Sequence, residues 1–370
     1  ARLDRLDDTS KRVAQTSSII GREFQYEALE SIFDDTAPLE EALMDLQRRE
    51  LIREKTRFPQ RTFIFKHAVT QETAYGSLLL SNRRQLHDRM AEFLVSNEAE
   101  RVNEIARHFV EARQSAKALP YMVTAGDNAS RNYSTQEAID FYTQSLDILE
   151  NEKNSALARK AYEGLAGALT FEFDVPGAVN AYHKMIHEAE DYNDMPMKVS
   201  ALNKLAFVTG AMQGQYPEAE SHLGDAEGIA RDCNDLEGLA EMHMNYCALR
   251  IPFGEFEDAH EHLTEAAELG ETLDLEEPRL FGLAHISTAK VCMTEFDEAW
   301  ESANEALEVA RKFGNRQYES EVLAMPVPFC LLREGKFDQA SEAATKAHQI
   351  GSQIGAAGGE STAAYVMAEI

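Results

Sequence analysis

The sequence has few cysteines, and none are spaced as a pair. Only four of the 370 residues are cysteine, and neighbouring ones are at least 14 positions apart. Disulfide frameworks and zinc sites need clustered cysteines, so we expect neither, and a reducing cytoplasm fits best. The four are Cys233, Cys247, Cys292 and Cys330.

Long hydrophobic runs are also missing. The longest uncharged segments, 205–217 and 347–359, are too short to span a bilayer and are rich in Gly, Gln and Ala. No signal peptide is recognisable, and we expect no membrane partner. The chain begins at Ala1 rather than Met and stops within a helical pattern at Ile370. We interpret it as a piece of a longer protein.

Catalytic motifs are absent as well. No Gly-x-x-x-x-Gly-Lys-Ser/Thr phosphate loop occurs, so these residues by themselves are expected to hold no ATP or other cofactor. His183 and His187 lie one helical turn apart, but Lys184 replaces the glutamate that a zinc protease needs. Solvated histidines are the plainer interpretation, so we predict no metal site and no enzyme within this chain.

Positive charge is scarce and uneven. The chain has 64 acidic and 36 basic residues, a net charge of −28. Residues 1–150 carry 25 acids and 20 bases, whereas residues 151–370 carry 39 and 16. Because nucleic-acid binding needs Lys and Arg on phosphates, we expect no nucleic-acid partner for the acidic part. Residues 44–90 instead carry a net positive charge, with ten basic and five acidic residues.

An internal repeat runs through the acidic part. A small or polar residue followed by alanine recurs at alanine spacings of 40, 41, 40, 40 and 41. The last four of these alanines follow an aromatic residue by three positions, and another alanine comes seven positions later. Glycine precedes three of the aromatics by two positions. The six period alanines are Ala138, Ala178, Ala219, Ala259, Ala299 and Ala340.

The repeat predicts antiparallel helix pairs. Glycine permits a tight turn, and small alanines let two helix backbones approach closely. Because one pair cannot bury its apolar face alone, the pairs are expected to stack into a solenoid. The spacing of the alanines and aromatics resembles the tetratricopeptide repeat, over roughly residues 115–370. This sequence departs from that family in its longer period of 40 and in Trp300, which falls in a second helix.

The first 95 residues do not share the repeat. Helices are predicted near 6–20, 26–33 and 39–50, followed by a hairpin of strands 51–55 and 61–65. Three helices and a hairpin are typical of a winged helix. The predicted fold is therefore all-α, with a winged-helix domain at 1–95 and tetratricopeptide-like repeats at 96–370. The repeats would form about six helix pairs plus a partial terminal helix.

Three stretches of this first part resemble one bacterial family. They read Ile-Ile-Gly-Arg-Glu-Phe from Ile19, Phe-Lys-His-Ala-Val-Thr-Gln-Glu-Thr-Ala-Tyr from Phe65, and Arg-Arg-Gln-Leu-His from Arg83. The sequence is similar to regulatory proteins in which a signal-transduction (STAND) ATPase precedes a winged helix and tetratricopeptide repeats. That resemblance implies an upstream ATPase binding ATP or ADP with Mg²⁺, and an effector such as an adenylate or guanylate cyclase or a transcription activator.

The resemblance also implies roles for Lys66 and His67. In relatives of these ATPases a winged-helix histidine reaches a phosphate of bound ADP, and Phe65-Lys66-His67 resembles that place. A helix N-terminus with His and Lys suits an anion. The plainer alternative is a histidine that fixes the hairpin to the next helix. DNA binding is disfavoured, because the candidate recognition helix carries Glu40, Glu41 and Asp45 near its start.

The repeats are the predicted binding surface for a protein or peptide. By family spacing, the first helix of each pair lines a groove whose residues are mostly apolar or neutral. The predicted function is a non-catalytic sensor that couples a ligand on the repeats to the upstream ATPase. The sensor of a transcription activator and a constitutive scaffold remain alternatives. The predicted groove residues are Lys204, Val208, Met244, Phe281, His285, Thr288, Met325 and Phe329.

Overall fold

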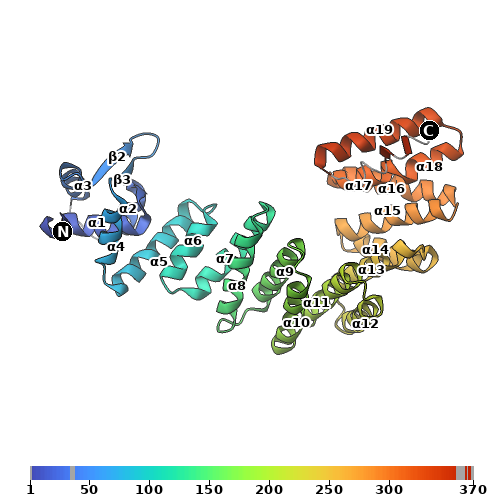
Figure 1. The fold of residues 1–370 in the computed structure, drawn as a ribbon, viewed down its shortest axis with the longest axis horizontal. Coiled ribbons are helices and arrows are strands. Elements are labelled where there is room, and N and C mark those ends of the chain that lie inside the picture. Colours follow the sequence, from blue (N-terminus) through green and yellow to red (C-terminus); the bar gives the residue numbers. More distant parts are fainter. Residues whose placement is uncertain (1, 34–37, 356–362, 365, 368–370) are drawn as a thin grey trace. The chain divides into compact units, whose positions relative to one another are not determined.

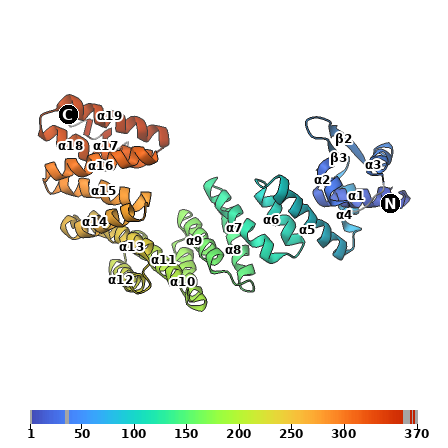
Figure 2. The same cartoon turned by 180° about the vertical axis from the view of Figure 1, so that it is seen from behind.

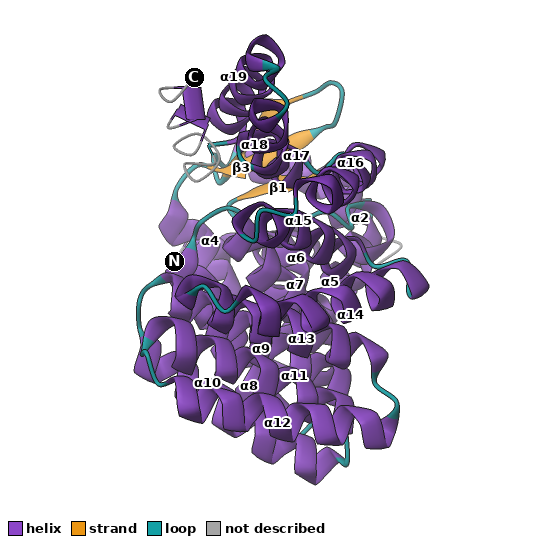
Figure 3. Cartoon of the chain, turned by 90° about the vertical axis from the view of Figure 1, so that its right-hand side faces the viewer, coloured by secondary structure: helices purple, strands orange, loops and turns teal. Residues whose placement is uncertain are grey.

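The computed structural model describes residues 2–33, 38–355, 363–364 and 366–367. Residues 1–172 and 173–370 each form a compact unit with its own internal contacts (Figure 1). The described strands all lie in the first unit, and the rest of the described secondary structure is helical (Figure 3). The sequence-based domain boundary at residues 95 and 96 stays a prediction.

The predicted helices and hairpin near the N-terminus are present. A small sheet of order β1-β3-β2 is antiparallel throughout. The sequence did not reveal β1, which has three residues and places Phe24 opposite Phe63. After a 3-10 turn (Arg2–Arg5), the elements are α1 (Asp8–Ile20), β1 (Glu23–Gln25), α2 (Tyr26–Ile32), α3 (Leu39–Arg48), β2 (Ile52–Thr56) and β3 (Thr62–Phe65).

Aromatic packing closes this sheet onto the helices. The rings of Phe24 and Phe63 stack with centroids 5.7 Å apart, and Phe65 lies 5.6 Å from Phe24. Each of the three is at most 1% exposed. Burying them favours the fold by roughly 1.5–3 kcal/mol per ring. Leu29 on α2 and Leu43 on α3 belong to the same cluster, so sheet and helices share one core.

Three further helices continue the first unit, namely α4 (Ala68–Gly76), α5 (Leu80–Asn97) and α6 (Val102–Glu111). A buried polar chain joins them. The hydroxyl of Tyr75 lies 3.0 Å from Nε2 of His87, whose Nδ1 is 2.8 Å from Nδ1 of His108. Arg107 donates to Nε2 of His108 at 2.9 Å. Both imidazoles are fully buried, so their hydrogen bonds have no competing water.

The repeat helices follow in the predicted alternation (Figures 1 and 2). The first unit contains α7 (Ser115–Arg131), α8 (Thr135–Leu149) and α9 (Ser155–Phe171). The second contains α10 (Val175–Tyr192), α11 (Met195–Phe207), a π-helical segment (Val208–Met212), α12 (Tyr216–Cys233), α13 (Leu236–Arg250), a 3-10 turn (Ile251–Phe253), α14 (Phe256–Thr272), α15 (Glu276–Cys292), α16 (Phe296–Phe313), α17 (Arg316–Ala324), α18 (Pro326–Arg333) and α19 (Phe337–Ile354). The predicted partial terminal helix falls mostly outside the described residues.

Packing explains the period. All six period alanines are fully buried, as are the four that follow them by seven positions, Ala226, Ala266, Ala306 and Ala347. Each lies on a second helix that packs against a first helix, and a small side chain lets the two backbones approach closely. The predicted glycine turns are also confirmed, because Gly214, Gly254 and Gly335 adopt φ between 71° and 77°.

Proline interrupts the first helix of the last described helix pair. α17 ends at Ala324 and α18 starts at Pro326, with Met325 between them at φ −129° and ψ −71°. Proline cannot donate the helical hydrogen bond, and it disfavours helical geometry in the residue before it. The result is two short helices in place of one.

A buried carboxylate ties three of these last helices together. Glu319 on α17 is 4% exposed. Its oxygens lie 3.2 Å from Arg311 on α16, 2.9 Å from Arg316 and 3.1 Å from Lys346 on α19. Burial raises the pKa of Glu319, but hydrogen bonds from Lys346 and Arg311 and the nearby cations outweigh it, so the net pKa is lowered.

Candidate functional site

Lys66 and His67 stand at the junction between β3 and α4. His67 is the residue before the first turn of α4, and its exposed side chain makes no capping hydrogen bond. The ammonium of Lys66 pairs with Glu50 at 3.2 Å, and its amide donates to the carbonyl of Leu51. The exposed imidazole is therefore presented to solvent at a helix N-terminus.

The basic residues near this junction are mostly neutralised within the first unit. Arg49 pairs with Asp45 at 2.7 Å, and Lys55 pairs with Glu23 at 2.6 Å. Arg61 contacts two carboxylates, and Arg48 and Arg57 each lie within 4 Å of one. The local excess of positive charge is thus smaller in the fold than in the sequence.

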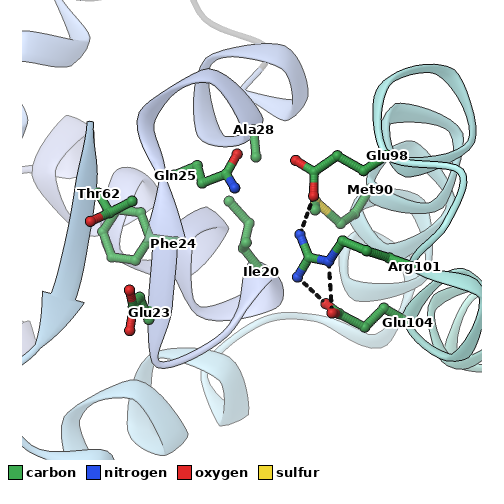
Figure 4. Close-up of a pocket in the computed structure, with 10 residues that line it drawn as sticks. All are labelled: Ile20, Glu23, Phe24, Gln25, Ala28, Thr62, Met90, Glu98, Arg101 and Glu104. Atoms are coloured by element: carbon green, nitrogen blue, oxygen red, sulfur yellow. Dashed lines mark hydrogen bonds and ion pairs between the residues drawn. The ribbon is translucent and has the colours of Figure 1, made fainter. Parts of the chain in front are cut away.

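A cavity of about 440 Å³ lies between the sheet and helices α5 and α6 (Figure 4). Its floor is apolar, with Ile20, Ala28 and Met90. On its rim, Arg101 is clamped by Glu98 and, through two hydrogen bonds of 2.5 and 2.8 Å, by Glu104. Glu23, which also lines the cavity, pairs with Lys55, so each charged side chain of the lining has an ion-pair partner.

The first helices of the second unit carry a row of half-exposed side chains, which we call the first-helix face. It lies between buried positions that recur on either side of it. On each helix its members are three or four residues apart, except for the adjacent Met244 and Asn245, and so lie toward one side. The first-helix face consists of Lys204 and Phe207 on α11, Glu241, Met244 and Asn245 on α13, Phe281, His285 and Thr288 on α15, Glu321 on α17, Met325 between α17 and α18, and Phe329 on α18.

Seven of the eight predicted groove residues belong to this face, and Val208 does not. Val208 is only 2% exposed, since the π-helical segment that it opens packs on α12 and α13. The exposed apolar side chain at this end of α11 is Phe207, at 43%. Wider i→i+5 hydrogen bonding shifts side-chain directions relative to an α-helix, and no residue pattern in the sequence indicates it.

Polar contacts organise the α11–α13 part of the face. Lys204 pairs with Glu241 at 2.7 Å, which holds two neighbouring first helices in register. Asn203 donates to the carbonyl of Gly238 at 2.9 Å and is fully buried, while its Oδ1 has no hydrogen-bond partner among the described residues. Asn245 donates to the backbone carbonyl of Asn203 at 3.0 Å. Sequence reasoning missed both asparagines, although Asn245 precedes His285 by one period.

Aromatic and imidazole groups dominate the α15 part. His285 stacks on Phe281 with ring centroids 4.1 Å apart, and its Nδ1 lies 2.9 Å from the carbonyl of Phe281. That carbonyl can only accept, so Nδ1 carries the proton and Nε2 is left as an acceptor. Burial lowers the pKa of His285, although the hydrogen bond opposes the shift, and the ring is neutral. The face thus offers flat apolar surface together with hydrogen-bonding groups.

The described residues contain no group of three or more His, Cys, Asp or Glu placed to hold a metal ion. Nor does any helix among them have the length and apolar character to cross a bilayer.

Comparisons with known proteins show the fold. No family model matches the sequence, and no curated protein matches it. A STAND protein with a tetratricopeptide repeat sensor, from Pyrococcus horikoshii, superposes with a TM-score of 0.62 at 16% identity. The match covers 99% of this chain and 54% of that one, so this chain spans about half its length. The chain has a tetratricopeptide-type helical-repeat fold.

Two Rap proteins share this helical-repeat fold. A Rap protein in complex with competence and sporulation factor aligns at TM-score 0.50 and 13% identity, over 97% of this chain and 96% of that one. The Rap conjugation gene regulator of plasmid pLS20, in complex with the Phr* peptide, aligns at 0.50 and 14%, over 78% and 91%.

Proposed function

We propose that the repeats are a sensor that binds a protein or peptide segment on the first-helix face. The observation that carries the proposal is the row of half-exposed Phe, Met, His and Asn side chains on consecutive first helices. Apolar rings supply contact area, and amides fix an extended backbone by hydrogen bonds. The similarity to Rap proteins in complex with a peptide supports the same ligand class.

A displayed peptide library tests this proposal on the chain itself. Peptides enriched on the wild type would be measured against Phe207→Ser/Thr288→Arg, which alters two half-exposed positions of the face. We expect their affinity to fall at least tenfold, since interface hot spots contribute about 2 kcal/mol or more. The control is Glu268→Gln, an exposed position on second helix α14.

Two outcomes would count against the first-helix face. One is a set of enriched peptides that bind the double variant as tightly as the wild type. The other is a library from which no peptide is enriched over an unrelated protein. Circular dichroism of both variants separates a lost contact from a lost fold.

For the first unit we propose a winged helix at residues 1–95 that couples the repeats to an upstream ATPase domain. The order helix, strand, two helices and two strands supports this interpretation. The exposed imidazole of His67, beside Lys66 at the start of α4, would contact a phosphate of bound ADP in that longer protein. ATP or ADP with Mg²⁺ would then be the cofactor of the parent and a nucleotide cyclase its effector.

Nucleotide retention tests the coupling. In the longer protein, His67→Ala is expected to speed ADP release, whereas His183→Ala, an exposed histidine of the repeats, is not. Unchanged retention and unchanged effector output in His67→Ala would refute the role of His67. We propose no nucleic-acid partner, because Glu40, Glu41 and Asp45 occupy the first turns of α3.

A further inference from the structure

A small cavity opens between the start of α16 and the end of α18. Its volume is about 180 Å³, and both helices contribute to its wall. The thiol of Cys330 on α18 lies 3.6 Å from the carbonyl of Phe296 on α16, which fixes the two helices against each other. The cavity shares no lining residue with the first-helix face, although Phe329 of that face packs in one apolar cluster with Phe296 and Cys330.

Aromatic rings form the apolar wall of this cavity. Trp300, the only tryptophan of the chain, lines it and is 38% exposed. Phe296 lies one turn earlier on the same helix. The face of an indole ring carries negative electrostatic potential and attracts cations more strongly than any other side-chain ring.

Carboxylates form the polar wall. Asp297 and Glu301 lie one turn apart on α16, and neither pairs with a cation among the described residues. Like charges at this spacing repel each other and weaken a helix. A third carboxylate, Glu334, is already paired with Lys336. A bound cation would relieve the repulsion between Asp297 and Glu301.

The cavity already holds one cation on one of its rings. The guanidinium of Arg333 on α18 lies 4.9 Å from the centroid of Phe296. Arg333 forms no ion pair with Asp297 or Glu301 in this part of the structure. One ring is thus occupied by an internal guanidinium, while Trp300 and two carboxylates face the remaining space.

We propose that this cavity binds the guanidinium group of an arginine side chain from a partner protein. The planar group would stack on Trp300 and donate hydrogen bonds to Asp297 and Glu301. The cavity is smaller than the roughly 300–1,000 Å³ of pockets for drug-sized ligands, which suits one side chain. Residues 173–370 carry 36 acidic and 13 basic residues, a net charge of −23 that attracts basic segments.

The single tryptophan makes the test direct. The whole chain is titrated with N-acetyl-arginine amide while the emission of Trp300 is followed. We expect a saturable change that weakens as salt is added, and none with the neutral isostere N-acetyl-citrulline amide. N-acetyl-lysine amide is expected to bind more weakly, because an ammonium has no planar fork of donors. Spermidine represents a free polyamine as an alternative ligand, and it should also bind less tightly than the arginine probe.

Variants should move the affinity in opposite directions. Asp297→Asn and Glu301→Gln are each expected to weaken binding of the arginine probe about threefold. Arg333→Gln is expected to tighten it, because it removes a like charge from the cavity. Glu308→Gln, an exposed position on the same helix, changes the net charge equally and should leave binding unchanged.

Ring chemistry is tested by calorimetry, since these variants remove the fluorescence. Trp300→Phe should retain binding better than Trp300→Leu, with circular dichroism confirming that both fold. The proposal is overturned by an unsaturable response, by an equal response to citrulline, or by Glu308→Gln weakening binding as much as Glu301→Gln. Tighter binding of spermidine than of the arginine probe would overturn the assignment to an arginine side chain.

Discussion

The buried chain Tyr75–His87–His108–Arg107 predicts a loss of stability in mild acid. Arg107 can only donate, so Nε2 of His108 accepts and Nδ1 of His108 carries the proton. That proton is donated to Nδ1 of His87, which leaves the proton of His87 on Nε2, facing Tyr75. A second proton on either ring would place two donors against each other, so both imidazoles must stay neutral in the folded state.

The pKa values follow from this geometry. Burial, with the charges of Arg107 and Arg83, lowers the pKa of His87 to about 4. Burial, Arg107 and the neighbouring imidazole lower the pKa of His108 to about 2. An unfolded histidine titrates near 6.5. Below pH 6.5 the unfolded state therefore binds more protons than the folded state. The free energy of unfolding consequently decreases as the pH is lowered.

The size of the effect comes from linkage. At pH 5.5, one unit below the pKa of the unfolded state, keeping one histidine neutral lowers the free energy of unfolding by about 1.4 kcal/mol. The two histidines together therefore lower it by about 3 kcal/mol relative to pH 7.5. The assay is urea denaturation of the wild type and of His87→Gln/His108→Gln, read by hydrogen exchange of α5 and α6 amides. Between the two pH values, the wild type should lose about 3 kcal/mol more than the variant.

Controls separate this chain from general acid effects. His67→Gln, which removes an exposed imidazole, should lose as much stability as the wild type. Equal losses in the wild type and the double variant would refute the reasoning. Nitrogen NMR of the wild-type imidazoles gives an independent readout, with protons expected on Nδ1 of His108 and Nε2 of His87.

Further predictions concern the second unit. Glu319→Gln should lower the urea-unfolding free energy by about 2 kcal/mol at neutral pH, since three cations lose their buried partner, with Glu308→Gln as a near-neutral control. Because the pKa of Glu319 is lowered, its stabilisation is present above pH 4.5 and lost as the pH falls below that; a pH-independent difference would contradict this. In thermal melts, Gly224→Ala should stabilise by about 0.5–1 kcal/mol, because open space surrounds this helical glycine. Gly335→Ala, at φ 73°, should destabilise by about 1 kcal/mol, and Gly282→Ala by about 2, because its Cβ would meet a backbone oxygen at 2.6 Å; the same sign for all three would contradict the reasoning.

The sequence predicted those features whose physical cause repeats every 40 residues. Ala259 and Ala299 are fully buried between closely packed helices, where a small side chain is favoured, and the same demand in each repeat gives a period in the sequence. The turn glycines were predictable as well, because a positive φ restricts which residues fit. Each of these signals is local to a few positions.

What the sequence did not predict depends on contacts between distant segments. Strand β1 has three residues, too few to show alternation, and exists because Phe24 finds Phe63 on β3. Phe207, and not the predicted Val208, lies on the first-helix face because the chain makes one π-helical turn there. His87 and His108 meet across two helices, and neither residue alone predicts a buried pair.

The residue that follows each period alanine is not restricted by the packing of the helix pairs. The alanines are buried, but the next residues along the last three repeats are His260, Trp300 and Ser341, which share no size or polarity. Packing of the helix pairs therefore does not require an indole at that place. Trp300 nevertheless stands there, 38% exposed, beside two carboxylates without a cation among the described residues. Neither the period nor the core accounts for this combination, so packing cannot decide its role, and the titration of the Trp300 emission with N-acetyl-arginine amide does.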